Sequence, residues 1–155
     1  MPTPDFVLAL REKIGTDPLW LSGVTAVVVK NDEVLLVRRS DTGEWTPVTG
    51  IIDPGEQPAI AAIREVEEEA DVVASVERLV RVSVTNPVVY PNGDRSQYLD
   101  LVFRLRYESG TPFPADGENT QAGWFPVDNL PPMSEDMVGR VRAALDNRPE
   151  AQFFV

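Results

Sequence analysis

Three glutamates with helical spacing are the residues of this chain best suited to metal chemistry. Glu65, Glu68 and Glu69 stand at positions i, i+3 and i+4, which on a helix places three carboxylates side by side on one face. Carboxylate oxygens are hard ligands suited to Mg²⁺ or Mn²⁺, and Mg²⁺ is commonly shared between a few carboxylates and substrate phosphates. The alternative for a bare glutamate run is a solvated acidic helix face.

The residues around these glutamates predict the helix that the spacing requires. Gly50 and Gly55 belong to a loop, and Pro58 suits the first position of a helix because its missing N–H and fixed φ cost nothing there. Residues 59–70 are rich in good helix formers. One face is apolar, through Ala59, Ala62, Ile63 and Val66. The sequence therefore predicts a loop and helix over residues 50–71.

The wider spacing resembles the signature of the Nudix hydrolase family, G-x5-E-x7-R-E-U-x-E-E-x-G-U, where U is aliphatic. The Nudix box of this chain, Gly50 to Val72, matches every fixed position except the second glycine, which is Asp71. Aspartate is among the few other residues that adopt the left-handed conformation with which helices often end. We therefore expect a local stability cost at Asp71 and no lost metal ligand.

The resemblance implies a reaction and a set of box residues that carry it. The family cleaves a nucleoside diphosphate linked to another moiety, by attack of water on a phosphorus while metal ions neutralise the diphosphate. The implied cofactor is Mg²⁺, for which Mn²⁺ can substitute. Its implied ligands are the backbone carbonyl of Gly50 and the carboxylates of Glu65, Glu68 and Glu69. Arg64 is implied to orient Glu68 or its neighbours, and Glu56 to bind the metal through water or to assist as a base.

The resemblance and the residue types also suggest site residues outside the box. Arg39 is implied to face the substrate phosphates, because its planar fork suits a pair of phosphate oxygens; a surface salt bridge is the alternative. Glu118 is the candidate general base, since some relatives carry a carboxylate in this loop, and Asp116 is the next candidate. Tyr90 is the predicted substrate-binding aromatic. Tyr98 and Trp45 are further candidates, although a buried aromatic usually belongs to the core.

Composition narrows the remaining choices. A chain of 155 residues is long enough for one domain with a real core, so we expect a single domain over residues 1–155. The absence of cysteine and histidine excludes disulfides, thiolate metal sites and a histidine base. The formal net charge of −11 argues against nucleic acid as a partner. No stretch approaches the ~20 apolar residues of a membrane span, and the first residues do not resemble a secretory signal. We expect a cytoplasmic protein with no membrane partner.

The elements that would position the site follow from hydrophobic periodicity. A short helix is predicted over residues 4–14 and a hairpin of strands over 24–29 and 34–39. Strands over 72–84 and 97–107 are expected to pair as a second hairpin through the Asn92-Gly93 reversal. A polar loop is predicted over 108–123, and a final helix over about 134–146 with Ser134 as its N-cap. The fold class is α+β, a Nudix-type α/β/α sandwich around a mixed sheet.

Other functions fit the sequence less well. A Nudix-fold isomerase uses cysteine chemistry, a non-catalytic nucleotide sensor usually loses box carboxylates, and a Ca²⁺-binding domain needs a loop spacing that is absent. We therefore expect a pyrophosphohydrolase acting on a small nucleotide or nucleotide derivative. The substrate alternatives are a nucleotide triphosphate, an oxidised nucleotide and a nucleotide sugar. A homodimer is a further possibility, because many relatives form dimers.

Overall fold

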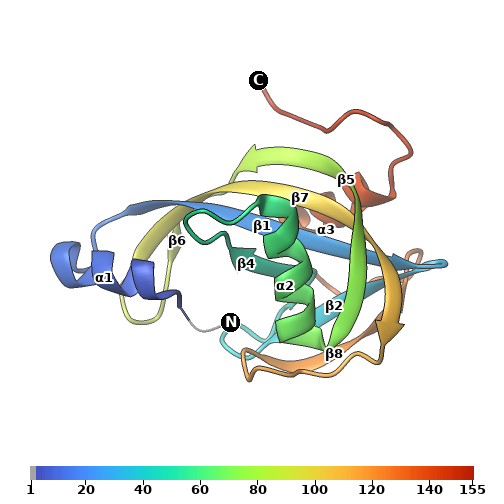
Figure 1. Cartoon of the computed structure of the whole chain (residues 1–155), viewed down its shortest axis with the longest axis horizontal. Helices are drawn as coiled ribbons and strands as arrows, with labels where there is room; N and C mark the ends of the chain where they lie inside the picture. The colour runs from blue at the N-terminus through green and yellow to red at the C-terminus, as the bar shows by residue number, and fades with distance from the viewer. Residues whose placement is uncertain (1–2) are drawn as a thin grey trace.

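The structure is a computed structural model that describes residues 3–155. In this range three helices and eight strands follow one another along the chain (Figure 1). Their order is α1 (Asp5–Ile14), β1 (Leu19–Lys30), β2 (Glu33–Arg39), β3 (Trp45–Thr46), β4 (Val48–Ile51), α2 (Pro58–Ala70), β5 (Val72–Val84), β6 (Val88–Val89), β7 (Arg95–Gly110), β8 (Asn119–Pro126) and α3 (Glu135–Leu145). The helix predicted in the Nudix box is α2.

The strands form one mixed sheet in which five follow the order β3-β2-β1-β7-β5. Of the other three, β4 pairs with β1, β6 with β7 and β8 with β2. The central pair, β1 and β7, is parallel, whereas β2, β4 and β5 pair antiparallel with their neighbours. On one edge β1 pairs with β4 over residues 23–26 and with β2 at residues 29–30. β4 therefore brings Gly50, at the start of the box, beside the centre of the sheet.

Both faces of the sheet are covered, because its central strands alternate apolar side chains in two directions. Val24, Ala26 and Val28 pack with the apolar side of α2, whereas Val27 packs with Val141 and the apolar side of α3. Figure 1 shows α2 and α3 on opposite sides of the strands. The predicted α/β/α sandwich around a mixed sheet is confirmed.

Two predictions about connections need correction. The Asn92-Gly93 turn joins β6 to β7, although β5 and β7 do pair antiparallel as expected. The predicted loop over residues 108–123 is shorter, because β7 continues to Gly110 and β8 begins at Asn119. These extensions are polar and have weak strand propensity of their own, so pairing with β5 and β2 decides their conformation. The loop that remains spans residues 111–118.

Both ends of α2 use the residues that the sequence singled out. Pro58 occupies the first turn, after Gln57 as N-cap. Asp71 ends the helix with φ 54° and ψ 37°, the left-handed conformation, and its N–H donates to the Glu67 carbonyl. The predicted left-handed helix end is therefore present. In α3, the Ser134 hydroxyl accepts from the Met137 N–H at 3.3 Å, as an N-cap does.

No helix within residues 3–155 is long and apolar enough to cross a membrane.

Candidate active site

The four glutamates of α2 divide into a buried pair, Glu65 and Glu69, and an exposed pair, Glu67 and Glu68. Glu65 and Glu69 are 0% and 2% exposed, one helical turn apart on the side of α2 that packs against the sheet. Glu68 is exposed, and its carboxylate lies 3.3 Å from Arg64. Since burying a carboxylate is costly unless it is paired or binds a metal, the pair is the unusual feature of this helix.

Gly50 closes over the Glu65 carboxylate. A Cβ built on Gly50 would lie 2.1 Å from the Glu65 Cδ and 2.3 Å from Oε1, closer than real atoms approach. Glycine at this position therefore allows the β4 backbone to approach the carboxylate directly. The backbone of Gly50 and the carboxylate of Glu65 therefore lie side by side. That both bind one metal ion stays a prediction from the resemblance.

Arg64 connects Glu56 with Glu65 inside the Nudix box through hydrogen bonds to both carboxylates. Its Nε and Nη2 donate to the two carboxylate oxygens of Glu56, at 2.7 and 2.9 Å. Its Nη1 donates to Glu65 Oε1 at 2.8 Å, and its Nη2 also donates to the Ile51 carbonyl at 3.3 Å. The bidentate bond from Arg64 lowers the pKa of Glu56. Glu56 is thus an ionised carboxylate that holds the Arg64 guanidinium in place. A carboxylate with a lowered pKa is a weaker base, so this arrangement does not favour the predicted role of Glu56 as a base.

A second group of carboxylates approaches Glu69 from the loop over residues 111–118. Ligand oxygens of Glu69, Asp116 and Glu118 lie within 4.8 Å of one another. Glu69 also accepts from the side-chain amide of Asn119 at 3.0 Å. Together with Glu65, these three carboxylates are called the acidic site below. The two candidate bases from the loop, Asp116 and Glu118, therefore lie beside the box and not in solvent away from it.

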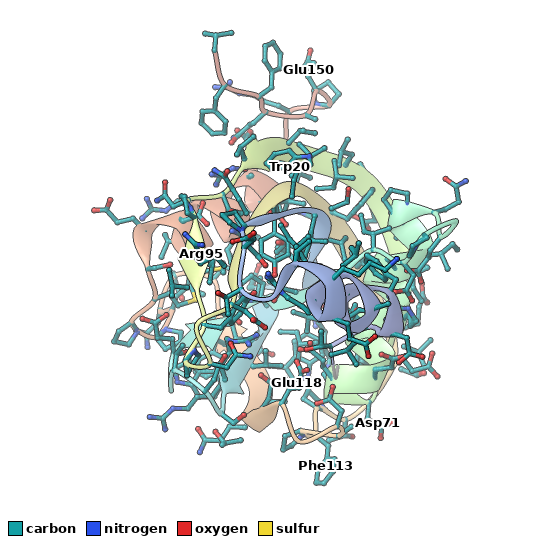
Figure 2. The ribbon with its side chains drawn as sticks, turned by 90° about the vertical axis from the view of Figure 1, so that its left-hand side faces the viewer. Trp20, Asp71, Arg95, Phe113, Glu118 and Glu150 are labelled. Atoms are coloured by element: carbon teal, nitrogen blue, oxygen red, sulfur yellow. The ribbon has the colours of Figure 1, made fainter. Side chains whose placement is uncertain are left out.

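The loop is held in place by the end of α2. The last carbonyls of a helix have no partner within the helix, and here Ala115 N–H donates to the Glu69 carbonyl and Phe113 N–H to the Ala70 carbonyl. Figure 2 shows Phe113, Asp71 and Glu118 together on the lower side of the molecule. At the other end of the loop, the Glu118 carbonyl accepts from the N–H and hydroxyl of Ser40, which follows β2. Both ends are anchored, so the loop carboxylates have a defined position.

Burial controls the protonation of the two helix glutamates. It raises the pKa of Glu65 to about 8, against the opposing effect of Arg64. It raises the pKa of Glu69 to about 7, which the hydrogen bond from Asn119 opposes. Glu65 Oε2 is buried and has no hydrogen-bond partner among the described residues. A buried carboxylate oxygen without a donor is the feature that a cation would satisfy.

Of the predicted substrate-binding residues, Arg39 is influenced by carboxylates of the acidic site. Arg39 makes a bidentate ion pair with Asp41, with both N···O distances 2.9 Å. This bond raises the pKa of Arg39, and the charges of Glu118 and Glu69 raise it further. Arg39 therefore forms the salt bridge that was the alternative interpretation, and its predicted contact with the substrate phosphates stays a prediction.

Tyr90 and Tyr98 form a hydrogen-bonded pair. Their hydroxyl oxygens are 2.5 Å apart, and burial with this bond raises the pKa of Tyr90. The charges of Arg39 and Asp41 also act on Tyr90. A Cβ built on Gly23 would meet Tyr98 at 3.3 Å and the Gly50 carbonyl at 3.5 Å, so Tyr98 lies one residue from the box.

Trp45 is not part of this group. Its ring packs edge-on against Phe125, with ring centroids 4.7 Å apart, in the cluster beneath α3 on the opposite face of the sheet. Asn119 is the residue of the site that the sequence did not suggest. It lies in a polar stretch outside the box, and a lone asparagine there carries no spacing signal, so only the fold reveals its contact with Glu69.

Comparison with known proteins places this geometry in a family. A family model described as a NUDIX domain matches residues 20–145. The NAD-capped RNA hydrolase NudC of Pseudomonas syringae pv. syringae (strain B728a) is 34% identical over 109 residues, which cover 69% of this chain and 36% of that protein. The 8-oxo-dGDP phosphatase NUDT18 of Homo sapiens is 33% identical over 131 residues, covering 79% of this chain and 38% of that protein. This chain thus spans little more than a third of the length of either relative.

A relative that this chain covers over most of its length and a solved structure point to the same family. The MutT-like protein of Streptomyces ambofaciens is 32% identical over 131 residues, covering 83% of this chain and 79% of that protein. The MutT NUDIX hydrolase from Burkholderia pseudomallei superimposes with a TM-score of 0.64 at 26% identity, covering 81% of this chain and 98% of that chain. The family model covers most of the chain, and the box is folded as a loop and helix over a mixed sheet: this protein belongs to the Nudix family.

Proposed function

We propose that this protein is a metal-dependent pyrophosphohydrolase that cleaves a nucleoside diphosphate linked to another moiety. The observation that carries the proposal is the buried pair Glu65 and Glu69, with pKa values raised to about 8 and about 7 and a Glu65 oxygen without a described hydrogen-bond partner. The relatives named as hydrolase and phosphatase support the same class of reaction.

The residues of the acidic site fit a Mg²⁺ or Mn²⁺ ion. The side-chain ligand atoms of this site are all carboxylate oxygens, which are hard ligands. Glu65 and Glu69 would hold the ion from the helix, the Gly50 carbonyl from β4, and Asp116 from the loop. Glu68 is turned towards Arg64 at the surface and would act from a more exposed position. When bound, the metal neutralises charge on the diphosphate and lowers the pKa of a coordinated water.

The remaining steps fall to the protein's own side chains. Arg39 would bind the diphosphate, since Asp41 fixes its guanidinium beside the acidic site. Glu118 would accept a proton from the attacking water, from a loop anchored at both ends. Arg64 would hold Glu65 in place, itself fixed by Glu56. Phosphoryl transfer depends mainly on such positioning and charge neutralisation.

Substrate recognition would involve Tyr90. The charge of Arg39 acts on Tyr90, which supports a substrate that has its diphosphate at Arg39 and its attached group near the tyrosine pair. An aromatic face next to the phosphates suits a nucleobase, which can stack on it. We propose a nucleotide triphosphate, an oxidised nucleotide or a nucleotide sugar as the substrate; the relative named as an 8-oxo-dGDP phosphatase supports the oxidised nucleotide. The cytoplasmic location and the homodimer stay predictions.

The test is product release from a panel of nucleoside triphosphates, oxidised nucleotides, nucleotide sugars and dinucleotides. Each substrate is incubated with Mg²⁺, with Mn²⁺ and with a chelator. We expect hydrolysis of at least one class with metal and none with chelator. Hydrolysis that persists with chelator would contradict the metal mechanism. No hydrolysis of any substrate, by a protein that binds metal and nucleotide, would favour a non-catalytic nucleotide sensor.

A further inference from the structure

Asn119 is a buried amide in contact with the acidic site. Its side-chain nitrogen donates to Glu69 Oε2 at 3.0 Å, and the residue is 5% exposed. Its other polar atom, Oδ1, is buried without a hydrogen-bond partner among residues 3–155. Buried polar groups of purely structural side chains are normally all satisfied. An apolar side chain would avoid this unpaired oxygen, so fold stability alone does not account for an amide here.

A β-bulge turns this amide towards Glu69. β8 pairs with β2 in regular register from Pro126 to Gln121, which faces Arg38, but the next pair is Asn119 with Arg39. Thr120 is therefore an extra residue in β8. Ala122 and Trp124 pack against the core beneath α2, and strict alternation would place Thr120 on that side. Because of the bulge, Asn119 occupies it and Thr120 is exposed. Bulges often redirect a side chain next to an active site.

Asn119 also completes the attachment of the loop to the helix. The loop over residues 111–118 is already joined to the Glu69 carbonyl through the Ala115 N–H. The amide of Asn119, directly after the loop, binds the side chain of the same glutamate. Glu69 is thus fixed through both its backbone and its carboxylate to the segment that carries Asp116 and Glu118.

We propose that Asn119 is a positioning residue that orients the Glu69 carboxylate for binding a divalent metal ion. The proposal rests on the proposed function, because it assigns Asn119 a task in the metal site. By holding Oε2, the amide restricts the rotamer of Glu69, whose carboxylate has an oxygen within 4.8 Å of oxygens of Asp116 and Glu118. Residues that orient a metal ligand in this way typically change metal affinity by about 10- to 100-fold when replaced.

The test measures Mn²⁺ affinity of the full chain from the electron paramagnetic resonance signal of free Mn²⁺. Asn119→Leu removes the donor and fills the space, and Asn119→Ala removes it without the bulk, in case leucine prevents folding. Thr120→Ala is the matched control, since it alters the same bulge on its exposed side. Glu69→Gln reports the loss of the ligand itself. Circular dichroism verifies that each variant is folded.

We expect both Asn119 variants to bind Mn²⁺ about tenfold or more weakly than wild type, with Thr120→Ala unchanged. The Mg²⁺ concentration for half-maximal hydrolysis should rise by a similar factor, while KM for the substrate at saturating Mg²⁺ stays constant. A merely structural role would lower the active fraction without moving the Mg²⁺ dependence. Folded Asn119 variants with wild-type affinity, beside a weakened Glu69→Gln, would overturn the proposal for Asn119 alone. A wild-type protein that binds no Mn²⁺ would overturn the proposed function and this inference together.

Discussion

At the scale of residues, burial separates three glutamates that look equivalent in spacing. Glu65 and Glu69 lie at i and i+4 beneath the helix, whereas Glu68, one residue before Glu69, is turned by about 100° around the helix axis into solvent. Burial without full compensation raises the pKa values of the first two. The chemistry of the site therefore depends on which side of α2 faces the sheet.

The raised pKa values give the metal-free protein a pH dependence of definite sign. An acid whose pKa rises on folding keeps its proton in the folded state where the unfolded chain has lost it. The free energy of unfolding therefore falls as pH rises from the ordinary value of 4.5 towards about 8 for Glu65. Glu65→Gln stays neutral throughout. We expect this variant to lose less stability than wild type between about pH 5 and about pH 8, by urea denaturation in chelator. Equal losses in both proteins would contradict the assignment.

Gly50 gives a second prediction at this scale. In Gly50→Ala the added methyl group would overlap the Glu65 carboxylate, with 2.1 Å between the new Cβ and Cδ. We expect a loss of about 1–3 kcal/mol in the free energy of unfolding, together with weaker Mn²⁺ binding. Gly123→Ala is the matched control, because its Cβ would meet nothing closer than 3.9 Å. If the two variants have the same free energy of unfolding and the same Mn²⁺ affinity, the predicted overlap between the added Cβ and the Glu65 carboxylate is contradicted.

At the scale of elements, the end of α2 organises the site. Asp71 stops the helix in the left-handed conformation, and the loop over residues 111–118 supplies donors to its last carbonyls. The same contacts carry Asp116 and Glu118 to Glu69. The hydrogen bonds between the loop and the end of α2 thus satisfy the last helix carbonyls and hold the loop in place. They also position Asp116 and Glu118, two of the four carboxylates of the acidic site.

Asp71 leads to a stability prediction that leaves activity unchanged. Glycine adopts the left-handed conformation without the steric cost that a Cβ adds. We expect Asp71→Gly to raise the free energy of unfolding by about 1 kcal/mol, and Asp71→Ala to lower it. Chemical denaturation measures both, and turnover of the folded protein should match wild type. A destabilised Asp71→Gly would show that the aspartate side chain stabilises the helix end in some other way.

The sequence predicted the elements whose patterns are strong and missed the contacts that depend on the fold. The apolar side of α2, the left-handed Asp71 and the Ser134 cap follow from local rules. The polar ends of β7 and β8 do not, because strand pairing and not propensity holds them extended. The same applies to Asn119: a bulge in β8, which depends on register with β2, turns it towards Glu69. The burial of Glu65 could not be read from its spacing either.

At the scale of the whole molecule, the two faces of the sheet have separate tasks. The face beneath α2 carries the acidic site, and the face beneath α3 carries a buried polar network. Arg140 is 5% exposed and donates to Thr25 at 2.9 Å, with Asp100 at 3.4 Å and Asp136 at 2.5 Å. Thr25 in turn donates to Asp100 at 3.0 Å. This network fixes α3 to β1 and β7 and contains no residue of the acidic site.

Arg140→Met tests this separation of tasks. The substitution leaves Asp100 buried without its cationic partner, and removing one partner of a buried ion pair costs about 3–5 kcal/mol. We expect a loss of this order in urea denaturation, part of which Asp100→Asn recovers in the double variant. Turnover per folded molecule and its Mg²⁺ dependence should stay at wild-type values. A changed Mg²⁺ dependence would show that the two faces are coupled.

The central claim is that the buried glutamate pair binds the metal that drives hydrolysis. The most direct measurement compares turnover of Glu69→Gln with that of Glu67→Gln, under saturating Mg²⁺ on a substrate that wild type cleaves. Both glutamates belong to α2 and both substitutions remove one charge, but Glu67 is exposed. We predict that Glu69→Gln lowers kcat by about 100-fold or more, while Glu67→Gln equals wild type. Wild-type turnover in a folded Glu69→Gln variant would contradict the account.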